Sequence, residues 1–216
     1  MTGTGRALLL ALALSAAPLA HAADECMLQL GHGWPPATEN HGNAVETLLV
    51  GDSQPALQLT WLPLRGAESA LMLVPAADGG AWTLRHAQPP ERVDQRETSA
   101  TGIRRVLLTE QQPEVLEVAI PAALATRLVE SWKRTLQAGV AADRGAQFHD
   151  DEVLSFVVDG ARFSGLAPDC GAGELMLEQA EALVDAADEG DPDDFQERWD
   201  DLGKSLDELD EELVAK

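Results

Sequence analysis

Two cysteines, Cys26 and Cys170, constrain this chain more than any other feature of its sequence. They lie near the two ends of the segment that carries most of the strand and helix patterns, and with only two of them the pairing is not ambiguous. The chain-entropy model assigns so long a loop a stabilisation of about 5 kcal/mol as an upper figure. Neither cysteine has a Cys-x-x-Cys partner or a neighbouring His or Lys, so we predict a structural disulfide rather than a reactive thiol.

The N-terminal residues predict export, which would place the cysteines in an oxidising compartment. Arg6 precedes an apolar run at residues 7–17, and small residues around Ala22 follow it, as in a secretory signal peptide of residues 1–22. The apolar run is about half as long as the roughly 20 residues that span a bilayer. We therefore expect a periplasmic or secreted protein with no membrane anchor and with one disulfide bond.

The charge of the chain limits the classes of partner. Without residues 1–22, which contain Arg6 and no acidic residue, 14 basic and 37 acidic residues remain, giving a net charge of −23. A polyanion would be repelled by such a protein, so nucleic acids and anionic membranes are disfavoured as partners. A cationic protein partner is compatible with this acidic surface.

Hydrophobic periodicity predicts the α+β class, with an antiparallel sheet packed by helices. Short apolar runs bounded by turn residues indicate strands, and Asp159-Gly160 predicts a hairpin turn. The expected strands are 57–62, 71–74, 82–86, 103–108, 115–120, 153–158 and 161–166, and the expected helix is 121–139 with Pro121 as its first residue. Residues 31–43 are expected to be a loop. Residues 88–101 are expected to be a loop or an exposed edge of the sheet. These elements make up an α+β domain at residues 23–173.

The C-terminal residues 174–216 predict an antiparallel helical hairpin packed on this domain or extending from it, with helices at 174–188 and 192–214 and capping residues at 190–192. The second helix has an apolar seam with the spacing of a coiled coil. The seam consists of Phe195, Trp199, Leu202, Leu206, Leu209 and Leu213. Residues 189–216 also carry 12 acidic and 3 basic residues. We expect the first helix to cover much of the seam and to leave the part around Leu209 and Leu213 free for a partner's groove or for a second copy in a homodimer.

Residues 132–184 resemble a pattern seen in exported (periplasmic) proteins of proteobacteria. The pattern consists of a helix that ends near Trp132, a hairpin with an Asp-Gly turn, a Pro and a Cys shortly after it, and then an acidic-apolar helix. The resemblance implies export and no particular activity, and it assigns no role to any residue.

The histidines and one tryptophan are the remaining candidates for binding residues. His32, His41 and His149 lie in segments expected to be loops, where they could form a metal site if the loops met. No short-spaced pair such as His-x-x-x-His fixes two ligands on one element. Trp34 lies between a Gly and a Pro and is either a loop residue that packs onto the core or an exposed contact. The other four tryptophans fall on apolar stripes and are expected in the core.

Together these patterns predict that the chain is a non-catalytic binding or inhibitor-like protein. We expect it to bind a cationic protein partner through its acidic surface, with apolar contacts from the C-terminal helix seam and the 31–43 loop. The disulfide should hold these two segments on the same side of the domain. No cofactor is expected. The alternatives are a metal-binding protein that uses the loop histidines and an enzyme of unrecognised type, although the Gly-x-Ser-x-Gly and Ser-x-x-Lys motifs do not occur.

Overall fold

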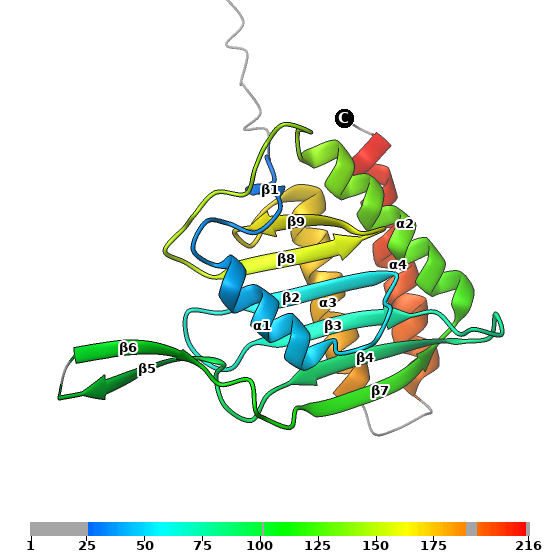
Figure 1. The fold of residues 1–216 in the computed structure, drawn as a ribbon. Helices are drawn as coiled ribbons and strands as arrows, with labels where there is room; N and C mark the ends of the chain where they lie inside the picture. Colours follow the sequence, from blue (N-terminus) through cyan, green and yellow to red (C-terminus); the bar gives the residue numbers. More distant parts are fainter. Residues whose placement is uncertain (1–25, 101, 189–193, 215–216) are drawn as a thin grey trace, which may run out of the picture.

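The computed structural model describes residues 26–100, 102–188 and 194–214 (Figure 1). Nine strands and four helices lie within these ranges. In chain order they are β1 (Leu30–His32), α1 (Glu39–Leu49), β2 (Leu57–Leu62), β3 (Ser69–Val74), β4 (Trp82–Gln88), β5 (Asp94–Ser99), β6 (Gly102–Leu107), β7 (Glu114–Ile120), α2 (Ala122–Gly139), β8 (Val153–Val158), β9 (Ala161–Gly165), α3 (Gly171–Asp188) and α4 (Phe195–Val214). The expected signal peptide at 1–22 and the capping residues at 190–192 lie outside the described residues.

A seven-stranded antiparallel sheet forms the centre of the fold, with the strand order β1-β9-β8-β2-β3-β4-β7. This confirms the predicted α+β class. The β8–β9 turn is made by Asp159 and Gly160, which both have positive φ values, 50° and 74°. Such values are required by the tight hairpin turns that match the twist of the strands, and Asp-Gly supplies them at low cost.

One face of the sheet is covered by α2 and α3, and α4 packs against these two helices. The largest buried side chains of this core include Trp132 on α2 and Phe156 on β8, which meet edge to face. The buried Gln179 of α3 links the helices because it accepts a hydrogen bond from the Trp132 indole (2.7 Å) and donates one to Ser205 of α4 (3.0 Å). The predicted helical hairpin is therefore part of the main hydrophobic core.

The opposite face of the sheet is covered by α1, which lies in front of β2 and β3 in Figure 1. Residues 31–43 were expected to be a loop, but they contribute to β1 and α1. β1 forms through long-range pairing with β9, which no local pattern could indicate. Trp34 and α1 thus pack on the face opposite the C-terminal helices, so the expectation that the 31–43 segment and these helices share one side is wrong. The chain crosses from one face to the other at the edge strand.

The predicted disulfide joins Cys26 to Cys170, with their Cα atoms 5.8 Å apart. It fastens the chain before β1 to the start of α3. None of the described helices has an apolar stretch long enough to cross a bilayer.

The apolar seam of α4 is more completely covered than the sequence suggested. Trp199, Leu202, Leu206 and Leu209 are buried, and Leu209 has no exposed surface. The expectation of an uncovered seam at Leu209 is therefore wrong. Phe195 and Leu213 at the two ends are half-buried. The reason is that α2 packs against α4 together with α3, and Asp210 of α4 accepts hydrogen bonds from α2.

Residues 88–101, expected to be a loop or an exposed edge, contain the end of β4 and all of β5. β5 pairs with β6 in a separate two-stranded sheet that projects from the body of the molecule (Figure 1). We call residues 94–107 the arm.

Candidate functional site

An acidic pocket of about 490 Å³ lies at one end of the main sheet, on the side covered by α3. Several strands end or begin there, so residues distant in sequence meet. β2 supplies Trp61, β4 supplies His86, and the residue before β8 is Glu152. Glu181 and Asp185 of α3 also line the pocket. These five residues are called the pocket residues below.

The register of the sheet explains how the strands place these side chains. His86 lies directly across from Leu71, and Leu71 lies across from Leu59, whose side chain is in the core under the helices. Trp61 is two residues after Leu59 and therefore points to the same face. Because α3 packs on this face, its residues 181 and 185, which are one turn apart, line the pocket together.

Burial changes the ionisation of two of the pocket residues. It lowers the pKa of the His86 imidazole below its ordinary value, against the opposing attraction of Asp188. It raises the pKa of Glu152, and the negative charge of Asp151 adds to this shift. His86 is therefore neutral at neutral pH. Perturbed groups of this kind in a pocket mark candidate functional sites.

The chemistry of the lining favours a cationic ligand. Among the described residues that line the pocket, three are carboxylates and Arg65 is the one permanent cation. Trp61 is half-buried and offers an aromatic surface in the same pocket. Carboxylates together with an indole are the groups that bind lysine, arginine and organic ammonium ions. Ser69 also lines the pocket, but in the described part of the chain no hydrogen bond joins it to His86 or Glu152, so these groups are not assembled as a catalytic triad.

The histidines that the sequence singled out occupy separate environments. The His41 Nε2 donates a hydrogen bond to the buried carboxylate of Glu68 at 2.7 Å. The ring of His32 packs against Phe163 at 5.0 Å between centroids. His149 is half-buried in the segment before β8. Across the described ranges, no group of three or more His, Cys, Asp or Glu side chains is placed to hold a metal ion.

Trp34 is half-buried and packs beneath α1. Its Nε1 donates a hydrogen bond to Asn43 (2.9 Å), and the guanidinium of Arg162 lies 4.3 Å from the ring centroid. Arg162 in turn makes two hydrogen bonds to the Glu46 carboxylate, at 2.6 and 2.7 Å. Trp34 therefore helps to fasten α1 to the sheet.

The pocket residues were missed by sequence reasoning. His86 and Trp61 fall inside strand patterns that predict only ordinary strand residues, and the sequence marks Glu152 only as a neighbour of His149. His86 is a polar residue between two apolar sheet neighbours, Leu71 and Leu116, but only the register of the sheet identifies these neighbours.

The chain was compared with protein-family models, curated proteins and solved structures, and no match was found in any of the three. The geometry of the chain itself is therefore the basis for any functional conclusion.

Proposed function

We propose that this is an exported binding protein that accepts a cationic group of a partner protein, a lysine or arginine side chain, in the acidic pocket. The observation that carries the proposal is the combination of Trp61 with Glu152, Glu181 and Asp185 around one pocket. The net charge of −23 without residues 1–22 supports it, because an acidic molecule attracts cationic partners and speeds their encounter. The disulfide agrees with a periplasmic or secreted location.

The pocket replaces the C-terminal seam as the proposed contact. Trp199, Leu202, Leu206 and Leu209 of the seam are buried in the core and would have to be exposed by unfolding before they could meet a partner. The pocket residues need no such rearrangement.

The ionisation of the pocket residues predicts how binding depends on pH. The raised pKa of Glu152 means that this carboxylate takes up a proton at a higher pH than an ordinary glutamate, and its attraction for a cation is then lost. Protonation of His86 on acidification can only add repulsion. We therefore expect affinity for a cation to fall on acidification, beginning above the usual glutamate range.

The experiment is an NMR titration of the ¹⁵N-labelled full chain with N-acetyl-arginine methylamide at pH 7. The matched ligand is the citrulline derivative, which has a similar shape and no charge. We expect the arginine derivative to shift the Trp61 indole signal and to bind at least about fivefold more tightly than citrulline, as expected when a charged partner pairs with carboxylates. Equal binding of the two ligands would contradict the proposal.

Two double variants locate the site. Glu181→Gln/Asp185→Asn removes two charges from the pocket wall and should weaken binding of the arginine derivative at least about fivefold. Glu174→Gln/Glu178→Gln removes two charges with the same spacing on α3, at exposed positions outside this pocket, and should leave binding within about twofold. If both double variants weaken binding equally, general surface charge accounts for it and the pocket does not.

A further inference from the structure

The arm is a separate structural unit that no partner strand supports. β5 and β6 pair only with each other in the described part of the chain, so both outer edges of the ribbon are open. Ile103 on β6 is 73% exposed. An isolated two-stranded hairpin is at best marginally stable in water, and it gains stability when another surface covers it.

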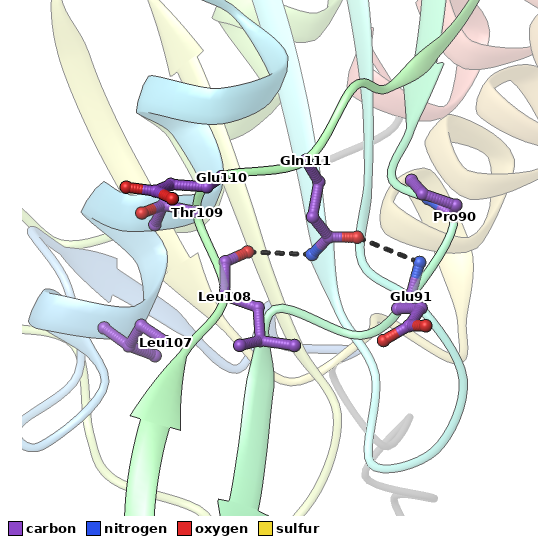
Figure 2. Close-up of a pocket in the computed structure, with 7 residues that line it drawn as sticks. All are labelled: Pro90, Glu91, Leu107, Leu108, Thr109, Glu110 and Gln111. Carbon is purple, nitrogen blue, oxygen red and sulfur yellow. Dashed lines mark hydrogen bonds between the residues drawn. The ribbon is translucent and has the colours of Figure 1, made fainter.

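The base of the arm is nevertheless held firmly. The buried Glu68 carboxylate accepts hydrogen bonds from the backbone amides of Val93 (2.7 Å) and Asp94 (3.2 Å), where β5 begins. On the other side of the base, the Gln111 side chain accepts a hydrogen bond from the Glu91 amide (3.1 Å) and donates one to the Leu108 carbonyl (2.8 Å), as Figure 2 shows. These bonds fix the arm where it leaves the body, so its faces are presented in a defined direction.

One face of the arm carries two arginines on paired strands, in contrast to the acidic composition of the chain as a whole. The arm contains three arginines, Arg96, Arg104 and Arg105, and two acidic residues, Asp94 and Glu97. Arg96 on β5 lies directly opposite Arg105 on β6, and the next pair on the same face is Thr98 with Ile103. Like charges directly opposite each other on a ribbon are destabilising. Arg105 is relieved by an ion pair with Asp94, whereas Arg96 has no ion pair or hydrogen bond to a described residue.

We propose that this face, formed by Arg96, Thr98, Ile103 and Arg105, is a docking surface for an acidic segment of a partner protein. A carboxylate of the segment would pair with the Arg96 guanidinium, beside the existing Arg105–Asp94 ion pair, and an apolar side chain would cover Ile103. Nucleic acids and anionic membranes also carry negative charge, but both are extended polyanions that the net charge of the whole molecule repels. A short protein segment meets only the local charge, because screening at physiological ionic strength limits interactions to about 8 Å.

The test uses fluorescence anisotropy with the full chain and a labelled peptide of alternating glutamate and valine residues. A peptide with glutamine in place of glutamate is the neutral control. We expect the acidic peptide to bind more tightly than the neutral one, and Arg96→Gln to weaken this binding about fivefold, which corresponds to the loss of one charge-assisted contact. Arg104→Gln is the matched control, because Arg104 lies on the other face of the same hairpin and already pairs with Glu97.

The outcomes separate this proposal from its competitors. Equal weakening by Arg96→Gln and Arg104→Gln, or no weakening by either, would overturn it. Tighter binding of a single-stranded oligonucleotide or of phosphatidylglycerol vesicles than of the peptide would also overturn it. The Arg96→Gln variant should keep or slightly raise the thermal midpoint, because it removes a like-charge pair and breaks no ion pair among the described residues. The proposal does not depend on the acidic pocket, and the Glu181→Gln/Asp185→Asn variant should bind the acidic peptide normally.

Discussion

The substitution Glu68→Gln tests whether a buried carboxylate holds the arm to the body of the protein. Glu68 has no exposed surface, and it lies where α1, β3 and the start of β5 meet. Its Oε1 accepts hydrogen bonds from His41 (2.7 Å) and the Asp94 amide (3.2 Å), and its Oε2 accepts one from the Val93 amide (2.7 Å). Glutamine has nearly the same shape, so the change alters charge and hydrogen bonding rather than volume.

The size of the effect follows from counting these hydrogen bonds. A glutamine has one acceptor oxygen, so its amide group must face at least one of the three donors. A buried donor left without an acceptor costs about 1–3 kcal/mol, and the bonds that remain lose the strength that the charge gave them, about 1 kcal/mol together. We therefore expect the free energy of unfolding to fall by about 3 kcal/mol at pH 7.

The same group predicts a pH dependence of stability. Burial alone would raise the pKa of Glu68, but hydrogen bonds from His41 and from the backbone amides of Val93, Asp94 and Glu68 itself outweigh it and hold the pKa below the ordinary value of 4.5. The unfolded chain then binds this proton more readily than the folded chain. The stabilisation is complete above pH 4.5 and is lost as the pH falls through the lower folded value. The difference in the free energy of unfolding between wild type and Glu68→Gln should therefore shrink as the pH falls through the folded-state pKa of Glu68.

The assay is urea unfolding followed by tryptophan fluorescence at several pH values, together with hydrogen exchange of the amides of Val93, Asp94 and Leu108. Exchange at these three amides should accelerate in the variant. The control is Glu97→Gln on the exposed part of the arm, which should change stability by less than about 0.5 kcal/mol. A loss of under about 1 kcal/mol for Glu68→Gln, or a loss that does not depend on pH, would refute the reasoning.

Two further predictions concern stability. Gly42→Ala should destabilise the protein by about 2 kcal/mol in urea unfolding, because a methyl group there would overlap the Trp34 indole under α1. Gly203→Ala, in α4 with open space around it, should instead stabilise by about 0.5–1 kcal/mol, and a loss of stability there would contradict the packing described. Replacing Cys26 and Cys170 by alanine should lower stability by up to about 5 kcal/mol, so equal thermal midpoints for the oxidised protein and the double variant would show that the disulfide adds nothing.

The elements that the sequence predicted correctly are those whose signals are local. Asp159-Gly160 predicts a hairpin because these two residues favour the backbone angles of the turn, and the structure contains that hairpin. The recurrence of Leu124, Leu128 and Trp132 predicts α2, although Pro121 precedes the helix as its N-cap instead of opening it. The cysteine pairing was predicted because only two cysteines exist.

The elements that were missed depend on contacts between distant segments. β5 is polar on both faces, so the alternation that marks a half-buried strand is absent, and only its pairing with β6 defines it. For the seam of α4, the sequence predicts cover by one helix. Periodicity shows that one face of a helix is buried, but it does not show how many helices bury that face. Glu68 was not noticed at all, because nothing in the sequence indicates that His41 and Val93 converge on it.

The acidic pocket could not be predicted for a similar reason. Its residues come from β2, β4, the segment before β8, and α3, and the strand order that brings them together is fixed by the β2–β8 pairing. His86 in a strand and Glu181 on a helix each look ordinary alone. Only the register of the sheet shows that they face the same space.

The β2–β8 pairing also has a consequence for the order in which the chain folds. β2, β3 and β4 are consecutive neighbours that can pair early, as can β8 and β9, because each requires only a short loop to close. The centre of the sheet cannot close until residues 153–158 reach β2, and β1 can join only after β9 is in place. Contacts of such long range form slowly. The first strand of the chain is therefore expected to be the last to join the sheet, and oxidation of the two thiols then makes that final step difficult to reverse.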